Sequence, residues 1–224
     1  MLPVWYAVFL LSVTCHEAAH ALAALRGGDR TAYLGGQVSL NPVPHVLREP
    51  IGTIVVPLLT FLQMGWMMGW ASAPYDPLWE ARHPRRAAFM AASGPLANLL
   101  LAGIAFAALK AGLGYGAFTI PADGISLDRL VSPSSGSPAL LEGVGRMLSV
   151  LLVLNLVLLV FNLFPLPPMD GASVVAGLVR PLRGAYESLR GSAMGSLAGL
   201  LAAYWLFQAA FPPIRDWVLL SLYS

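Results

Sequence analysis

The sequence has little charge and almost no cysteine. Only 11% of its 224 residues are charged, whereas a soluble globular domain carries about a quarter. The single cysteine, Cys15, excludes an intrachain disulfide framework and any zinc site built from several cysteines, so histidine and carboxylate remain as metal ligands. The net charge of +2 is too small and too dispersed for nucleic-acid binding, so we expect no nucleic-acid partner.

Apolar residues, glycine and proline are abundant instead. Hydrophobic residues make up 57% of the chain and the mean hydropathy is +0.70, which indicates lipid rather than water as the solvent. The 22 glycines and 18 prolines suit a membrane bundle, because small residues let helices approach closely and neighbouring helices tolerate kinks. We expect an all-α polytopic membrane protein, a single domain over residues 1–224, surrounded by the lipid bilayer.

Four segments are long and apolar enough to cross a bilayer as helices. They are Leu2–Leu25, Ala87–Leu109, Val144–Phe164 and Ser192–Phe211. A fifth segment, Ile51–Trp70, contains glycine and proline and either spans the membrane or re-enters it. The first segment lacks the basic start of a signal peptide, so we do not expect it to be cleaved. The prediction is a bundle of about four to six transmembrane helices.

Two connecting segments differ from these spans in composition. Gly27–Pro50 contains a glycine turn followed by a short extended stretch, which indicates a β-hairpin or a loop beside the membrane. Gly112–Gly143 is rich in glycine, proline and serine, which indicates a solvent-facing loop. Both segments are expected to lie outside the bilayer core.

Arginine residues cluster in three places, and short cytoplasmic loops are enriched in such residues. The groups are Arg26, Arg30 and Arg48; Arg82, Arg85 and Arg86; and Arg180, Arg183 and Arg190. If Ile51–Trp70 crossed the membrane, the first two groups would face opposite sides, so a re-entrant segment is favoured there. We expect a multi-pass membrane protein with all three groups on the cytoplasmic side.

The first predicted span carries His16, Glu17 and His20. Two histidines four residues apart share one face of a helix and can bind one zinc ion. A glutamate beside them can accept a proton from water and deliver it to a leaving amine. Chance alone would produce this pattern on the order of once per thousand such sequences. The alternatives are a pair of hydrogen-bonded core histidines or a structural zinc site.

A catalytic zinc ion usually needs a third protein ligand, and Asp170 is the best candidate. It follows a long apolar helix and three prolines that end this helix, and Gly171 after it permits a tight turn. The positions of the arginines place Asp170 on the same side of the membrane as His16 and His20. The alternative is an aspartate that caps a short helix over Ala172–Val179.

Together these motifs resemble the site-2 protease family of intramembrane zinc metalloproteases. The resemblance rests on His16, Glu17 and His20, and on Asn162–Gly171, which is similar to that family's asparagine, proline and aspartate-glycine element. The chain departs from the pattern at Met169, where leucine is usual, and in the residues after the fifth segment. Neither departure affects a predicted ligand.

The resemblance covers most of residues 14–177. Its further similar stretches are Gly36–His45, Ile51–Pro57 and Gly94–Asn98. It implies that His16, His20 and Asp170 hold one Zn²⁺ per chain, that Glu17 is the catalytic base, and that the substrate is a transmembrane helix of another protein. The fold it implies is that of the compact bacterial and archaeal branch of the family, located in the prokaryotic cell membrane with the active site nearer the cytoplasmic side. We expect no appended PDZ-type or CBS-type domain.

Five further residues are weaker candidates for positioning a substrate: Asn98, Asn162, Val38, Ser39 and His45. The two asparagines lie in apolar helices, where they either bind the substrate backbone and the oxyanion or hold helices together. Residues 35–41 are expected to form an edge strand that pairs with an unwound substrate. His45 contacts the substrate, senses pH or is simply a solvated loop histidine.

Two other functions stay open at this point. A catalytically silent zinc-binding membrane adaptor needs no general base, so the presence of Glu17 argues against it. A metal transporter predicts several carboxylates along a path, but only Glu17 and Asp170 lie well inside apolar segments. The sequence does not identify the substrate, the scissile bond, the regulation or the oligomeric state.

Overall fold

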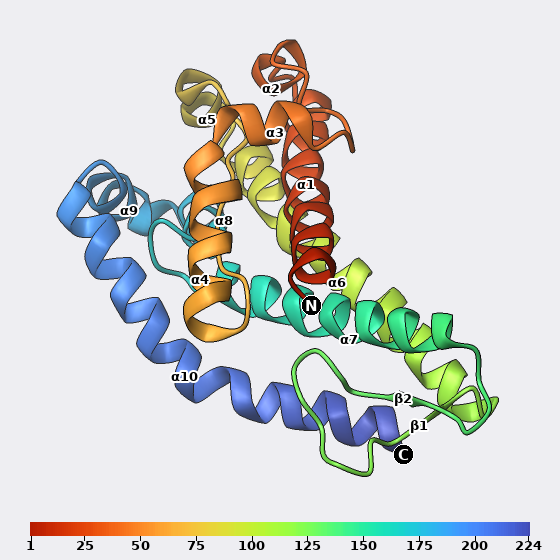
Figure 1. Cartoon of the computed structure of the whole chain (residues 1–224). Helices are drawn as coiled ribbons and strands as arrows, with labels where there is room; N and C mark the ends of the chain where they lie inside the picture. The colour runs from red at the N-terminus through yellow and green to blue at the C-terminus, as the bar shows by residue number, and fades with distance from the viewer.

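The computed structural model describes residues 1–224 and is almost entirely helical (Figure 1). Its longest helices are α1 (Leu2–Gly27), α6 (Pro84–Gly114), α7 (Ala139–Asn162) and α10 (Ala193–Tyr223). Each has the length and the apolar composition needed to cross a membrane. The four predicted spans and the all-α polytopic class are therefore confirmed. The last span is longer than predicted, because α10 continues through Pro212 and Pro213.

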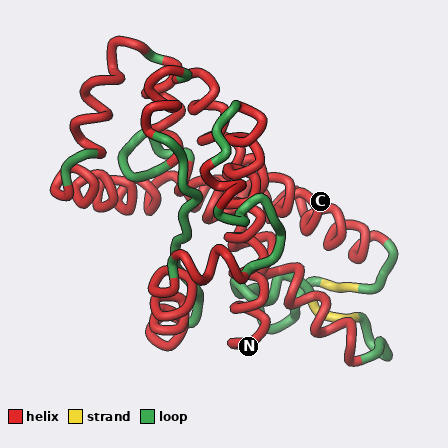
Figure 2. The backbone as a smooth tube through the Cα atoms, turned by 90° about the horizontal axis from the view of Figure 1, so that it is seen from above, coloured by secondary structure: helices red, strands yellow, loops and turns green.

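Shorter elements connect these four helices. They are α2 (Thr31–Leu34), α3 (Val43–Arg48), the π-helix Ile51–Val55 leading into α4 (Val56–Met64), α5 (Pro77–Arg82), α8 (Asp170–Leu178), the 3₁₀-helix Arg180–Leu182 and α9 (Arg183–Arg190). Two short strands, β1 (Phe118–Thr119) and β2 (Ser132–Pro133), pair antiparallel. Figure 2 shows these strands together at one edge of the molecule, with helices and loops everywhere else.

The ends of the helices follow from the local sequence. Helix α1 ends at Gly27, and Gly28 after it adopts the left-handed conformation at φ 101°. The Gly28 N–H donates to the Leu25 carbonyl and the Asp29 N–H donates to the Ala24 carbonyl. Helix α6 begins with a proline in its first position, where the missing N–H has no cost. Helix α7 ends at Asn162, shortly before Pro165, because proline disfavours continuation of a helix.

The ambiguous fifth segment runs into the molecule and doubles back. After α4 the chain reverses at Gly65, at φ 77°, and returns beside the helix to α5 (Figure 1). The N–H of Trp70 donates to the Gly52 carbonyl at 3.1 Å, and a Cβ on Gly69 would lie 2.3 Å from that same oxygen. Both ends of the segment thus lie together, which is the geometry expected of a re-entrant segment and not of a span.

The expected strand near the amino-terminal loop is not present. Val38, Ser39 and Leu40 lie in bends between α2 and α3, so the prediction of an edge strand over residues 35–41 is wrong. This segment turns back on itself, and the Ser39 carbonyl bonds to His45 on α3. The short hairpin lies instead within the 112–143 connection. The rest of this connection between α6 and α7 is mainly loop, as predicted, but it does not face solvent throughout, because Phe118, Leu130 and Val131 are buried in the core.

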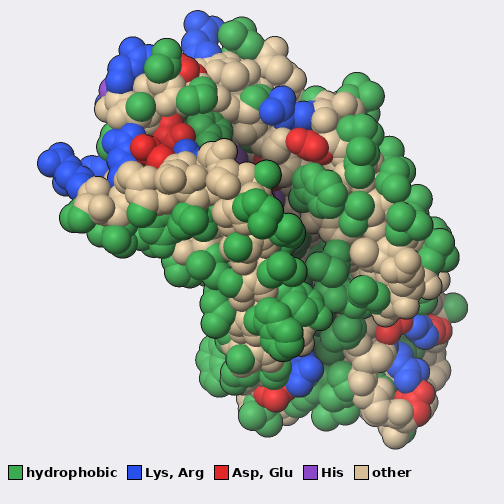
Figure 3. Space-filling view, turned by 90° about the vertical axis from the view of Figure 1, so that its left-hand side faces the viewer, with side chains coloured by type: hydrophobic (Ala, Val, Ile, Leu, Met, Phe, Trp, Pro, Cys, Tyr) green, Lys and Arg blue, Asp and Glu red, His purple; other side chains and the backbone are tan.

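The three arginine groups meet at one end of the molecule. Arg86 donates to the carbonyl of Gly27 at 3.1 Å, and Arg183 donates to the carbonyl of Ala81 at 3.1 Å. Figure 3 shows Lys and Arg side chains gathered at the upper end of one face, a smaller mixed group of charges at the lower end, and mostly hydrophobic surface between them. This banded surface is the pattern of a protein that crosses a bilayer.

The main hydrophobic core is formed by α1, α6 and α7 together with part of the 112–143 connection. Its largest fully buried side chains include Trp5, Phe9, Leu109, Leu152 and Leu154. Helix α10 contributes less and lies along the outside of this core (Figure 1). The core fixes α1, α6 and α7 against one another, and the polar cluster described below lies where these helices meet α8.

Candidate metal centre

Helix α1 presents a pair of buried histidines. His16 and His20 are each 7% exposed, their ring centroids are 4.6 Å apart, and their Nε2 atoms are 2.9 Å apart. The spacing of four residues places both rings on one face of the helix, as predicted. Burial of two imidazoles in a helix of membrane length requires partners from other elements.

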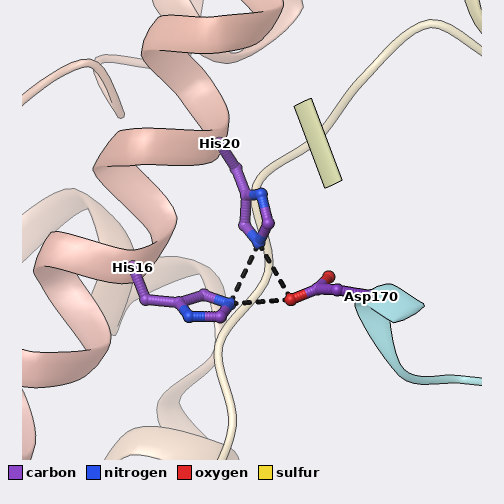
Figure 4. Close-up of side chains that lie close together, drawn as sticks. All are labelled: His16, His20 and Asp170. Carbon is purple, nitrogen blue, oxygen red and sulfur yellow. Dashed lines mark hydrogen bonds and ion pairs between the residues drawn. The ribbon is translucent and has the colours of Figure 1, made fainter. Parts of the chain in front are cut away.

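Asp170 completes the cluster from a distant part of the chain. Its Oδ2 atom lies 3.1 Å from His16 Nε2 and 3.4 Å from His20 Nε2, and the three side chains point toward one another (Figure 4). Asp170 is the first residue of α8, but its side chain makes no capping hydrogen bond with that helix. The structure therefore does not support the alternative in which Asp170 is only a helix cap.

The chain before α8 is folded tightly enough to place this carboxylate. Prolines follow the end of α7, and the backbone of Gly171 packs directly against the preceding turn. A Cβ on Gly171 would lie 2.4 Å from the Leu163 carbonyl oxygen and 2.5 Å from that of Phe164. Only glycine fits there, so the aspartate-glycine pair of the sequence has a steric reason.

Helix α6 covers the histidine pair from the other side. Its carbonyl of Met90 accepts a hydrogen bond from His20 Nδ1 at 2.8 Å, and the side-chain oxygen of Asn98 accepts one from His16 Nδ1 at 2.6 Å. Gly94 lies between them: a Cβ there would lie 2.3 Å from His20 Nε2 and 2.6 Å from His16 Nε2. Helix α6 thus holds both rings and leaves the space in front of their Nε2 atoms free of side chains.

The donor set fits a bound cation. Because each histidine donates its Nδ1 proton to an oxygen, both Nε2 atoms present lone pairs to the same point. The third atom there, Asp170 Oδ2, is buried and has no hydrogen-bond partner. Three acceptors that face one another repel unless a positive charge lies between them.

The spacing of these three atoms also matches zinc. Zinc bonds of about 2.0 to 2.1 Å in tetrahedral geometry separate the ligand atoms by about 3.3 Å. The observed separations are 2.9, 3.1 and 3.4 Å. Two imidazoles and one carboxylate, with a fourth position left for water, form a common donor set of catalytic zinc sites. The residues present therefore fit a zinc ion.

Glu17 follows the first histidine and is also buried, at 5% exposure. Its carboxylate makes no hydrogen bond or ion pair with another protein group, in contrast to the two histidines beside it. A buried carboxylate without an internal partner next to a candidate metal site is available for proton transfer.

The weaker candidates lie in different surroundings. Asn98 is part of the cluster, whereas Asn162 only donates to the Leu158 carbonyl of its own helix at 3.0 Å. His45 is 1% exposed rather than solvated, and its Nε2 lies 3.1 Å from the Ser39 carbonyl. No hydrogen bond connects Val38, Ser39 or His45 to His16, His20 or Asp170.

No role was predicted for two contributors to the site, although one of them lies in the Gly94–Asn98 stretch that resembles the family. The Met90 carbonyl and the bare Gly94 carry no side-chain chemistry that a motif would reveal. A signal was nevertheless present, because Met90, Gly94 and Asn98 are spaced by four residues and so share one face of a helix. This face of α6 lies opposite the face of α1 that carries His16 and His20.

The chain matches a family of known proteins over most of its length. The model of peptidase family M50 matches residues 4–206. "Putative zinc metalloprotease YwhC" of Bacillus subtilis is 34% identical over 182 residues, which cover 81% of this chain and 71% of that protein. "Putative zinc metalloprotease Rip2" of Mycobacterium tuberculosis is 28% identical over 209 residues, which cover 93% of this chain and 67% of that protein.

No solved structure matches the chain. The family match nevertheless includes all the elements that meet at the metal cluster, from α1 through α8. The relatives named as zinc metalloproteases agree with the donor set described above, and the four apolar helices agree with a membrane location. The chain therefore belongs to peptidase family M50, the site-2 protease family of membrane zinc metalloproteases.

Proposed function

We propose that this chain is an intramembrane endopeptidase that hydrolyses peptide bonds within or beside transmembrane helices of other membrane proteins. In this proposal His16, His20 and Asp170 hold one zinc ion per chain, and Glu17 is the catalytic base. The observation that carries it is the convergence of three buried ligand atoms, from two distant elements, beside a partnerless carboxylate. Membership of peptidase family M50 supports the same chemistry.

The residues of the site divide the chemistry of hydrolysis between them. A zinc ion held there supplies Lewis-acid activation of the scissile carbonyl and of water. Glu17 accepts the proton of the attacking water and later delivers it to the leaving amine, so that no charged amide anion has to leave. The hydrogen bonds from His16 and His20 to α6 keep both rings fixed while Glu17 transfers the proton.

The position of the cluster along α1 supports access from one membrane surface. His20 lies about 10 Å along the helix axis from the last residue of α1, at the end where the arginines gather. Short loops rich in arginine stay in the cytoplasm. We therefore place the active site nearer the cytoplasmic face of a prokaryotic cell membrane, where water can reach it.

A substrate helix has to approach from within the bilayer. Figure 3 shows a hollow in the hydrophobic face of the molecule, with histidine atoms visible inside it. An apolar approach suits a transmembrane segment, because such a segment leaves the lipid only for another apolar surface. The substrate must unwind locally to expose its carbonyl, since a helical backbone is fully hydrogen-bonded.

The experiment is a cleavage assay with the purified chain in lipid vesicles that contain a panel of single-helix membrane proteins. Glu17→Gln should lower cleavage by about 10² to 10⁴-fold, because it removes the general base, and should leave the zinc content unchanged. Glu142→Gln is the control, since Glu142 lies at the other end of the chain's bundle and only pairs with Arg146.

Three outcomes separate the functions. Cleavage by the wild-type chain that is lost in Glu17→Gln supports the protease. Zinc binding with no cleavage of any panel member by wild type favours the adaptor. Equal cleavage by wild type and Glu17→Gln would remove Glu17 from its role as base.

A further inference from the structure

The hydrogen bond of His16 is the first in a chain of fully buried polar side chains. Asn98 on α6, Asn155 on α7 and Ser12 on α1 are each 0% exposed. The amide nitrogen of Asn98 donates to Asn155 Oδ1 at 2.8 Å. The amide nitrogen of Asn155 donates to Ser12 Oγ at 2.9 Å and to the Leu151 carbonyl at 2.8 Å. We call these three side chains the amide relay.

Backbone carbonyls fix the direction of every bond in the amide relay. The Leu151 carbonyl can only accept, so the end of the Asn155 amide that faces it is the nitrogen. Ser12 donates its only proton to the Val8 carbonyl at 2.7 Å, so it too can only accept from Asn155. The Asn155 oxygen must therefore face Asn98.

The direction of the bonds is also fixed between Asn155 and the candidate metal site. Asn98 uses its nitrogen toward Asn155, so its oxygen faces His16 Nδ1 at 2.6 Å. An oxygen acceptor there requires the proton of His16 to be on Nδ1 and leaves a lone pair on Nε2. The direction of bonds set at two carbonyls thus selects the tautomer of His16 that can bind a metal ion.

We propose that Asn98, held by Asn155 and Ser12, is a positioning residue that fixes the tautomer and ring orientation of His16 as a metal ligand. This inference rests on the proposed function, since it gives His16 a metal to bind. It replaces the expectation that Asn98 binds the substrate backbone, because both polar ends of its amide are already engaged inside the protein.

The two histidines differ in how they are held, and this difference makes the proposal testable. His20 bonds to a backbone carbonyl, that of Met90, which no side-chain substitution removes. His16 depends on a side chain alone. Loss of the Asn98 oxygen therefore frees one ligand ring and leaves the other in place.

The test measures zinc affinity of the purified full chain in detergent by competition with a chromophoric chelator. Asn98→Leu should weaken zinc binding by about 10 to 100-fold, the usual cost of removing a group that orients a metal-bound histidine. Asn98→Asp keeps an oxygen toward His16, so it should retain most of the zinc affinity, although its lost donor to Asn155 lowers stability. The visible absorption of the Co²⁺-loaded chain should change in Asn98→Leu only.

A control separates this role from simple helix packing. Ser149 is also 0% exposed, lies on α7 and bonds to the Gly145 carbonyl and the Leu130 N–H, away from the metal cluster. Ser149→Ala should lower the stability of the metal-free chain without changing zinc affinity. A role of Asn98 confined to holding helices together predicts the same behaviour for Asn98→Leu.

Several outcomes would overturn the inference. Wild-type zinc affinity in Asn98→Leu contradicts it, and so does an Asn98→Asp chain that binds zinc as weakly as Asn98→Leu. If Asn98→Leu does not fold, Asn155→Leu gives the same test, with a smaller expected loss of affinity; no loss there contradicts the relay. A wild-type chain that binds no zinc would instead overturn the proposed metal site itself.

Discussion

Helices α1 and α10 have almost the same mean hydropathy but opposite surroundings. Their most apolar windows have mean hydropathy values of 1.5 and 1.4, yet 61% of that window is buried in α1 and only 17% in α10. Helix α1 carries Ser12, His16, Glu17 and His20 on its buried side, whereas the corresponding stretch of α10 carries exposed apolar residues such as Trp205. Hydropathy identifies both as spans but does not show which one lies at the centre.

The difference has a physical cause. An ionisable side chain in hydrocarbon costs at least about 2.5 kcal/mol, so a helix that carries three of them has to be enclosed by other helices that supply partners. In this chain α6 and α8 provide partners for His16 and His20, and α7 provides one for Ser12. Glu17 is buried in the same place without a partner. Helix α10 needs no such partners and can face lipid.

The largest effect that tests this comparison is expected at Gly94. Gly94→Ala places a methyl group within 2.3 Å of His20 Nε2, and the ring cannot retreat because Met90 holds it. Zinc binding should fall at least about 100-fold, more than for a residue that only orients a ligand. Gly103→Ala on the same helix is the control, since nothing lies within 4 Å of its Cβ. Metal analysis of both purified variants decides, and equal zinc contents would contradict the enclosed geometry.

A smaller effect is expected when one aromatic side chain is removed from each helix. Phe9 on α1 is 0% exposed and Trp205 on α10 is 73% exposed. Phe9→Ala should lower the free energy of unfolding by about 3 kcal/mol because it leaves a cavity, whereas Trp205→Ala should change it by less than about 0.5 kcal/mol. Unfolding of both variants in mixed micelles measures this. Similar losses would mean that α10 is packed as tightly as α1.

The smallest effect concerns the carboxylate just beyond α1. Burial alone raises the pKa of Asp29, but hydrogen bonds from the Thr31 hydroxyl, the Thr31 N–H and the Asp76 N–H hold this pKa below its usual value. A lowered pKa stabilises the fold at pH values above about 3.9, the pKa of an aspartate in the unfolded chain. This stabilisation is lost as the pH falls through the pKa of the folded state.

Asp29→Asn should therefore lower the free energy of unfolding by about 1 kcal/mol at neutral pH, and the difference from wild type should shrink toward pH 3. Paired unfolding curves at several pH values measure it. A difference that is constant with pH would show that the charge of Asp29 is not involved. The residue before α10 makes no comparable bond to a distant segment, since the Ser192 side chain accepts only from Gly195 of its own helix.

Much of the architecture and the core of the site followed from local sequence. The four spans were readable because each is a long apolar run, and the pairing of Asp170 with His16 and His20 followed from the motif and from the arginine distribution. These patterns lie within single segments or are summed over loops, so they can be recognised without knowing how the helices pack.

The remaining features depend on contacts between distant segments. For Asn98 the sequence left a substrate contact and a contact between helices as alternatives, because nothing in the sequence relates it to Asn155 and Ser12 on two other helices. The strand expected around Val38 and Ser39 needs a partner strand, which the fold does not provide. The strand was predicted from a glycine turn and an extended stretch alone, which do not show whether a partner strand lies nearby.

The proposed metal site depends most directly on Asp170 sharing one metal ion with the two histidines of α1. Zinc stoichiometry and affinity of the wild-type chain and of Asp170→Ala test this, with Asp216→Ala on α10 as a control far from the cluster along the chain. We expect one zinc per chain in wild type and in Asp216→Ala, and strongly weakened binding in Asp170→Ala. Full zinc binding with unchanged affinity in Asp170→Ala would contradict it.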